Sequence, residues 1–236
     1  MAPRALLAAS LACALVACAA APESRGEAVA TAVQTALPHA AHAETPGSWY
    51  ASGAEAAAAR GAGQASARNL ILFVGDGMGP TTVAAARILD GQRRGATGEE
   101  NLLSFERFPH TGYSKTYNTD LQTPDSAGTM SAMMSGVKTR AGLIGLDSRA
   151  RLGECASTEA ARIPSPLQLA ERAGLATGIV TSTRVTHATP AAAYAHAAHR
   201  DWEADSLVPP AERARCADIA RQLIEFEHGD GIEVVM

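Results

Sequence analysis

The pattern of hydrophobic and polar positions becomes regular at Asn69 and predicts an α/β fold from there on. Residues 69–74 form a continuous apolar run of strand length, as is typical of a parallel strand buried on both faces. Further strands are predicted at residues 108–117, at 176–182 and from Gly231 to the end. Helical spacing and helix-start residues predict helices at residues 81–89, 126–137, 165–173, 190–198 and 211–226. Such alternation indicates a mostly parallel sheet flanked by helices, with ligands at the carboxyl edge of its strands.

Residues 1–44 lack this pattern and read as a leader followed by a tether. Arg4 and the apolar residues 5–17 are typical of an export signal, and the apolar stretch is too short to span a bilayer. The segment LVAC ending at Cys18 resembles the bacterial lipoprotein box, in which Cys18 would carry lipid; ordinary cleavage after Ala17-Cys18-Ala19 is the alternative. Both readings export the protein to the periplasm or cell envelope, and a lipid anchor would be its only contact with a membrane.

The domain boundaries follow from the same change of pattern. Residues 1–18 are the predicted signal peptide, and residues 19–44, rich in Ala with Pro, Glu, Thr and Gly, predict a flexible linker. Residues 45–236 are then the folded part, which opens with an Ala-rich segment at 48–66 that could form a short helix.

Composition narrows the class of protein further. The 236 residues carry a net charge of −4, which argues against nucleic-acid binding because such proteins usually present a basic face. Aromatic residues make up 4% of the chain, so the core must be mainly aliphatic. Export would leave Cys155 and Cys216 in the folded part, where an oxidising compartment favours one disulfide over the alternative of two buried thiols.

Two candidate chemical groups follow predicted element boundaries early in the chain. Asp76 comes directly after the first apolar run, in the glycine-rich turn GDGMG, where it could bind a metal or simply form an Asx turn. Ser126 stands at a helix start, where free N–H groups and the helix dipole suit a phosphate. No histidine is near Ser126 in sequence, so activation by a metal is the natural route to a nucleophile. The alternative is a plain N-cap serine.

A second group of candidates follows the strand predicted at 176–182. His187 and Thr189 offer a ring nitrogen and a hydroxyl two residues apart, unless Thr189 is only the N-cap of the next helix. Arg200 could hold phosphate through two N–H groups at once, or could pair at the surface with Asp201 or Glu203. His196 and His199, three residues apart on an Ala-rich segment, receive no role.

Several longer segments, taken together, resemble the alkaline phosphatase family, and its animal-type branch in particular. They are NLILFVGDGMG, SKTYNTDLQTPDSAGT, GVKTRAGLIGLD, TSTRVTHATPAAAYAH and HRDWEAD. The resemblance runs from about Trp49 to Met236 and implies hydrolysis of phosphate monoesters through a phosphoserine intermediate. It also implies two Zn²⁺ and one Mg²⁺ in the complete site, and a homodimer.

The resemblance implies a role for each matched residue. Ser126 would be the nucleophile, its alkoxide held by a zinc-site ion, and Arg200 would bind two phosphate oxygens while Asp125 orients it. Asp76 would bridge a zinc and the magnesium. Thr189 would be a magnesium-site ligand, and His187 would tune that site through water. Cys155 and Cys216 match a disulfide of the animal branch.

One departure from the family qualifies these roles. The family takes most of its zinc ligands from its C-terminal half, whereas this sequence stops at GIEVVM, so Asp76 is the only matched zinc ligand. We therefore expect a truncated fold that is inactive by itself. A related metal phosphodiesterase or sulfatase is a second enzyme reading. Sulfatases carry a different signature around the nucleophile, which the segment beginning at Ser126 lacks. A noncatalytic envelope lipoprotein that retains a phosphatase-like half fold is the alternative function.

Overall fold

The computed structural model describes residues 44–59 and 67–236. The predicted signal peptide with Cys18, and nearly all of the predicted linker, lie outside the described residues. Within the described residues, no helix is both long enough and apolar enough to cross a membrane.

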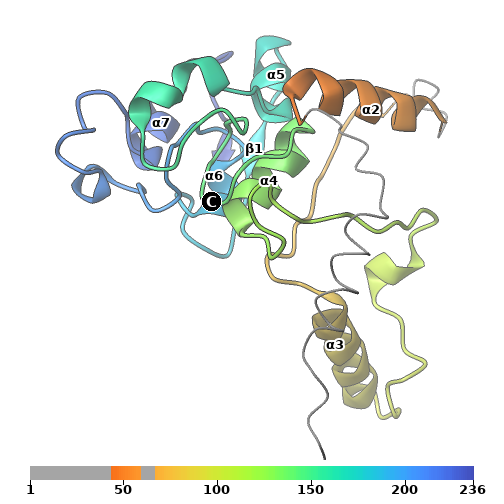
Figure 1. Ribbon diagram of the computed structural model, residues 1–236. Coiled ribbons are helices and arrows are strands. Elements are labelled where there is room, and N and C mark those ends of the chain that lie inside the picture. The colour runs from red at the N-terminus through yellow and green to blue at the C-terminus, as the bar shows by residue number, and fades with distance from the viewer. Residues whose placement is uncertain (1–43, 60–66) are drawn as a thin grey trace, which may run out of the picture. The chain divides into compact units, whose positions relative to one another are not determined.

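The described chain combines helices with a parallel strand pair (Figure 1). In chain order the elements are α2 (Pro46–Ala59), α3 (Pro80–Arg93), η1 (Ser104–Arg107), α4 (Ser126–Ser135), η2 (Cys155–Ser157), η3 (Glu159–Ala161), α5 (Pro166–Arg172), β1 (Gly178–Ile179), α6 (Ala188–Ala191), η4 (Asp205–Leu207), α7 (Ile219–Ile224) and β2 (Val234–Val235). β1 and β2 pair in parallel, with Gly178 opposite Val234 and Ile179 opposite Val235. The α/β class with parallel pairing is thereby confirmed.

The helix starts follow from their capping residues. Asp125 has an extended backbone and its side chain accepts a hydrogen bond from the Gly128 N–H, which begins α4. Ser165 caps α5 through a reciprocal pair of bonds with Gln168, and Pro166 takes the first helical position. α4 ends at Gly136, whose φ of 75° is a left-handed conformation that glycine adopts without strain. The two helix starts agree with the sequence prediction, whereas α4 ends at Ser135, two residues before the predicted end.

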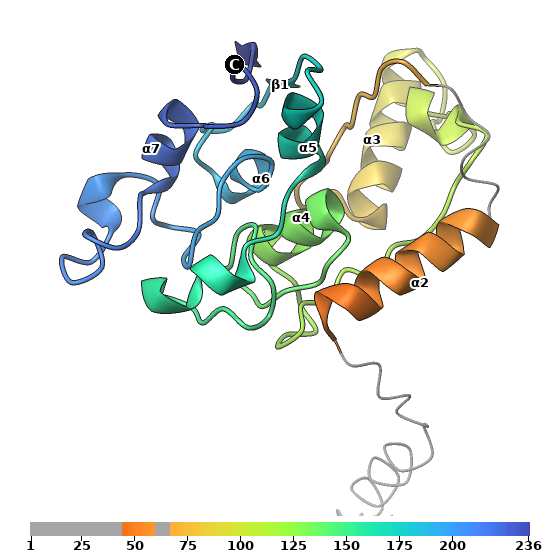
Figure 2. The same ribbon diagram turned by 90° about the horizontal axis from the view of Figure 1, so that it is seen from above.

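The core is built from small and aliphatic side chains, as the composition predicts. Its largest cluster joins Met130 of α4, Leu167 of α5, Ile179 of β1 and Ala191 of α6. Both views place β1 beside α5 and α6 (Figure 2). This packing fixes the start of α4 close to the start of α6, and those two helix starts carry most of the candidate site.

A second cluster of buried residues surrounds a disulfide. Cys155 and Cys216 are bonded, with their Cα atoms 5.7 Å apart, so the predicted pairing is confirmed. Trp202, 5% exposed, packs against Cys155, Ala198 and Val208 in this cluster. The cross-link therefore lies beneath the segment that follows Arg200.

Two predicted strands are wrong in the described structure. Residues 69–74 have no strand assignment, and Leu70, Ile71 and Phe73 are 86%, 76% and 89% exposed. Residues 108–117 are likewise irregular, and Tyr113 is fully exposed. A strand needs a neighbour to pair with its N–H and C=O groups. Within residues 44–59 and 67–236, only β1 and β2 form such a pair of strands.

Four other elements are shorter than predicted, and one of them is the strand expected from Gly231, which is limited to β2. The helix expected at 190–198 ends at Ala191, because the chain turns so that Ala197 can bridge to Ile144 in an antiparallel contact. The helix expected at 211–226 begins only at Ile219, after its N-cap Asp218. The strand expected at 176–182 is limited to β1, since its partner β2 spans only two residues.

Candidate functional site

Asp125 lies at the centre of the candidate site and binds four different segments. One carboxylate oxygen accepts hydrogen bonds from the Gly128 N–H at 3.0 Å and from Asn118 Nδ2 at 2.9 Å. The other accepts from the Gly142 N–H at 2.9 Å and from Arg200 Nη1 at 3.2 Å. A Cβ atom at position 128 would stand 2.6 Å from Asn118 Oδ1, so glycine is required for this close approach. The carboxylate thus caps α4 and anchors Arg200 at once.

The surroundings of Asp125 favour its ionised form. Burial by itself would raise the pKa of this carboxyl group. The hydrogen bonds from the two backbone N–H groups, from Asn118 and from Arg200 outweigh burial, so the pKa lies below its ordinary value. Asp125 therefore presents a negative charge to Arg200.

Arg200 is held from two sides and keeps donors free for a ligand. Its Nη1 donates to Asp125, and its Nη2 lies 3.3 Å from His187 Nε2. The side chain is 25% exposed. A guanidinium has five N–H donors, so donors remain after these two contacts. Asp125 thus holds one side of the guanidinium, and the alternative of a surface pair with Asp201 is limited to a 3.8 Å contact.

Ser126 is the first residue of α4 and borders a cavity of about 530 Å³. Asp76 and Asp125 supply acidic groups to the same cavity lining, and Thr116, Thr129 and Thr189 supply hydroxyl groups. The N-cap of α4 is Asp125, so the reading of Ser126 as a plain N-cap is wrong. In the described structure its hydroxyl makes no side-chain hydrogen bond, and it stands where the positive end of the helix meets the cavity.

Asp76 and Thr189 meet although 113 residues separate them. The Thr189 hydroxyl donates to Asp76 Oδ2 at 2.6 Å. Asp76 lies in the predicted glycine turn, where Gly77 has a φ of 69°. Thr189 lies in α6, whose N-cap is His187, so Thr189 is not the cap. The structure therefore brings four of the predicted site residues into one cavity lining, namely Asp76, Asp125, Ser126 and Thr189. Arg200 joins them through Asp125, and His187, the N-cap of α6, contacts Arg200.

The donor set decides which metals these residues fit. The Asp76 carboxylate and the Thr189 hydroxyl are hard oxygen donors, the kind that Mg²⁺ prefers. His187 Nδ1 is buried with no hydrogen-bond partner in the described structure, which leaves a polar atom available to a water or an ion. Zinc normally needs four protein-side ligands or three plus water, and residues 44–59 and 67–236 contain no cluster of three His, Cys, Asp or Glu side chains. These residues fit part of a magnesium site and do not by themselves fit a zinc site.

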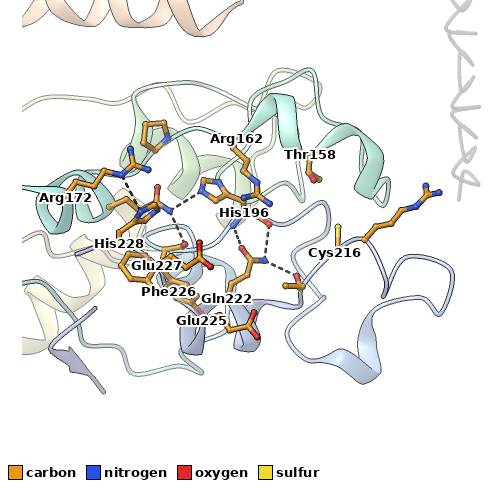
Figure 3. A pocket seen from close by; sticks show the side chains of 15 residues that line it. Thr158, Arg162, Arg172, His196, Cys216, Gln222, Glu225, Phe226, Glu227 and His228 are labelled. Carbon is orange, nitrogen blue, oxygen red and sulfur yellow. Dashed lines mark hydrogen bonds between the residues drawn. The ribbon is translucent and has the colours of Figure 1, made fainter. Parts of the chain in front are cut away.

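His196 lies in a different pocket, of about 470 Å³ (Figure 3). Its Nδ1–H donates to the Gly145 carbonyl at 2.7 Å, and its Nε2 accepts from Gln168 Nε2 at 3.1 Å. Two other groups that line this pocket, Arg172 and His228, contact each other at 3.4 Å. His196 and Gln168 are thus engaged with each other and with the backbone, and His196 receives no role in the candidate site.

We expect His196 to make the protein sensitive to acid between pH 6.5 and 4. Burial lowers the pKa of its ring to about 4, whereas the unfolded chain binds the proton near 6.5. Stability is therefore fully present above pH 6.5 and falls as the pH drops toward 4, by about 2 kcal/mol at pH 5. Urea unfolding of dilute protein at pH 7 and pH 5 measures this loss. His196→Gln should remove this part of the loss and the exposed control His110→Gln should keep it; equal loss in both would contradict the assignment.

Reasoning from the sequence missed three residues that hold the candidate site or the loop beside it in place. Asn118 and Gly142 bind Asp125 from loops, and neither position carries a helical or strand period that could mark it. Glu203 was considered only as a surface partner of Arg200, whereas it binds Arg184 at 2.6 Å. The only available signal for all three is their place inside the family-like segments.

Comparisons with known proteins identify the family of this chain. The family model described as "Alkaline phosphatase" matches residues 67–236. The tissue-nonspecific alkaline phosphatase of Gallus gallus is 52% identical over 160 residues, which are 67% of this chain and 31% of that protein. The alkaline phosphatase of Gadus morhua is 52% identical over 171 residues, which are 72% of this chain and 35% of that protein.

Among solved structures, the alkaline phosphatase of Thermus thermophilus is 29% identical, with a TM-score of 0.48, and the match covers 68% of this chain and 29% of that one. The assignment rests on the family match and the sequence identities rather than on this superposition. The chain spans about a third of the length of the curated relatives it matches. On this evidence, the chain belongs to the alkaline phosphatase family.

Proposed function

We propose that this chain supplies the nucleophile and the phosphate-binding arginine of an enzyme that hydrolyses phosphate monoesters. The observation that carries the proposal is the double role of Asp125, which caps the helix that begins with Ser126 and also holds Arg200. One carboxylate thereby links a free hydroxyl at a helix N-terminus to a cation suited to phosphate. Family membership supports the same reaction class, and so do the named activities of the relatives.

The residues divide the reaction between them. Ser126 Oγ attacks phosphorus, the Oγ–P bond forms, and the bond from phosphorus to the ester oxygen breaks so that an alcohol leaves with a proton. Water then attacks the phosphoserine and releases inorganic phosphate. Arg200 and the N–H groups at the start of α4 stabilise negative charge on the phosphate oxygens. Asp125 keeps the guanidinium in place.

The proposal includes only the metal ion for which the described residues offer ligands. We propose that Asp76 and Thr189 hold Mg²⁺, with His187 acting through water. When bound, metal ions supply positive charge that polarises the phosphate and lowers the pKa of a hydroxyl. The two Zn²⁺ implied by the family would need ligands beyond the described residues.

The reaction class is tested with a family-length protein, by which we mean this chain continued past Met236 to the length of its relatives. It is expected to release nitrophenol from p-nitrophenyl phosphate and not from p-nitrophenyl sulfate. A preference for the sulfate ester, or no turnover of either with Zn²⁺ and Mg²⁺ supplied, would contradict the proposed class.

Arg200 should contribute more to binding phosphate than to the chemical step. A charge-assisted, two-point contact is lost in Arg200→Ala, so inhibition by inorganic phosphate should weaken by about ten- to a hundredfold. The measurement is the inhibition constant of phosphate in the family-length protein. Arg221→Ala is the matched control, because Arg221 is an exposed arginine of α7 that pairs with Glu225, the C-cap of that helix. Unchanged phosphate inhibition in Arg200→Ala would make Arg200 only a structural charge.

We also propose that the protein acts outside the cytoplasm as a homodimer. The leader-like residues 1–18 support export, and the LVAC segment supports a lipid on Cys18. Mass spectrometry of the mature N-terminus distinguishes lipidation from ordinary cleavage, and sedimentation of the family-length protein tests the dimer.

A further inference from the structure

Glu203, three residues beyond Arg200, binds two residues of the loop that leads into α6. Its Oε1 accepts from Arg184 Nη2 at 2.6 Å, and its Oε2 accepts from Arg184 Nε at 2.8 Å. Oε2 also accepts from the Thr186 hydroxyl at 2.5 Å. One carboxylate therefore joins the segment of Arg200 to the loop that carries His187.

The backbone around Glu203 is held by a buried cluster and by hydrogen bonds from α7. Trp202 is buried in the cluster around the Cys155–Cys216 disulfide, and its carbonyl accepts from the Ile219 N–H at 2.9 Å. The Glu203 carbonyl accepts from the Ala220 N–H at 3.2 Å. The backbone around Glu203 is thus fixed on both sides before its side chain makes any contact.

The loop on the other side is tied at consecutive residues. Glu203 binds Arg184 and Thr186, and between them the Val185 carbonyl accepts from the Tyr194 hydroxyl at 2.9 Å. His187, which follows Thr186, donates its N–H to the Arg184 carbonyl at 2.9 Å. His187 is the N-cap of α6, which also contains Thr189. The direction of this loop therefore sets the positions of His187 and Thr189.

We propose that Glu203 is a positioning residue that fixes His187 and Thr189 relative to Arg200. It does not face the cavity beside Ser126, so its effect passes through the loop and not through contact with substrate. We call the contacts of Glu203 with Arg184 and Thr186 the clamp. The clamp follows from these contacts alone, whereas its effect on turnover rests on the proposed function.

An ordinary surface ion pair would contribute little, and Glu203 differs from one in three ways. Its side chain is 16% exposed although Arg184 is 66% exposed. Its contact with Arg184 is bidentate, and a hydroxyl adds a third bond. The hydrogen bond from Arg184, helped by Thr186 and against the effect of burial, lowers the pKa of Glu203 to about 2. The carboxylate is therefore ionised at neutral pH.

Amide hydrogen exchange on the 236-residue chain tests the clamp without any need for activity. Glu203→Gln should speed exchange of the His187 N–H by about tenfold, because the charge-assisted pair is lost and the loop opens more often. Exchange of the Gly136 N–H, which bonds to the Ala132 carbonyl at the end of α4, should not change. Glu225→Gln is the matched control, since Glu225 is also paired with an arginine but lies in the segment ending α7. Glu203→Asp should restore part of the protection.

Unchanged exchange at His187 would overturn the clamp, and so would faster exchange at both amides, which would mean that Glu203 only stabilises the whole fold. In the family-length protein, Glu203→Gln should weaken phosphate inhibition by about three- to tenfold through the His187–Arg200 contact, and Glu203→Asp should recover part of it. A kinetic effect absent while the exchange effect is present would reject the catalytic consequence alone. Failure of the proposed function would instead appear as indifference to loss of the Ser126 hydroxyl.

Discussion

Ser126→Ala in the family-length protein is expected to lower kcat for p-nitrophenyl phosphate by at least about a thousandfold, because the atom that attacks phosphorus is removed. The hydroxyl borders the cavity at the first position of α4 and makes no side-chain bond in the described part of the chain. Since Asp125 is the N-cap, the substitution leaves the cap bond to Gly128 in place. The loss should therefore be catalytic and not structural.

Two measurements separate those possibilities. Urea unfolding of Ser126→Ala should match the parent within about 0.5 kcal/mol, as for a substitution that removes no packed group or cap. The control Ser182→Ala, at an exposed serine, should keep both turnover and stability. Turnover near the parent's in Ser126→Ala would place the nucleophile elsewhere.

The 236-residue chain by itself is expected to show no measurable hydrolysis of p-nitrophenyl phosphate with Zn²⁺ and Mg²⁺ supplied. Asp76 and Thr189 offer two oxygen donors, and the described residues contain no further cluster with zinc-ligand chemistry. A two-metal phosphatase needs both ions at a fixed separation. Stoichiometric zinc binding together with family-like turnover would overturn this expectation and would require ligands from a second chain.

The same chain should also self-associate. The apolar residues 70–73 are exposed, and β1 and β2 form a pair with unpaired outer edges in the described structure. Sedimentation velocity should show concentration-dependent aggregates, reduced by the pair Leu70→Lys and Phe73→Lys. The control Tyr113→Lys removes another exposed side chain from a different segment and should change association less.

Elements fixed by contacts between residues close in sequence could be predicted, and elements fixed by contacts between distant residues could not. Helix starts at Asp125 and Ser165 were predictable, because the cap, the proline and the first turn lie within four residues of one another. The run at 69–74 has the composition of a strand, but strand formation depends on a pairing partner elsewhere in the chain. The length of the helix before Ala197 was decided by Ile144, more than fifty residues away.

The residues of the candidate site that follow predicted strands could be predicted from the sequence, whereas those in loops could not. Asp76 and Thr189 each follow a predicted strand, so the rule of the carboxyl edge brings them together although one of those strands is not formed. Asn118 and Gly142 could not be found in this way, because both reach Asp125 from loops without a repeating pattern. Loop contacts of that kind depend on the assembled core and not on local sequence.

The four hydrogen bonds accepted by Asp125 restrict which substitutions position 125 can tolerate in evolution. An asparagine there could still offer one oxygen to Gly128 and Asn118, but its NH₂ group would face the Gly142 N–H and Arg200, donor against donor. The helix cap could survive such a change while the hold on Arg200 was lost. No single second substitution could repair the loss, because the donors come from separate segments. We expect substitutions at position 125 to be rare among natural sequences, and substitutions at loop residues that do not bind Asp125 to be more frequent.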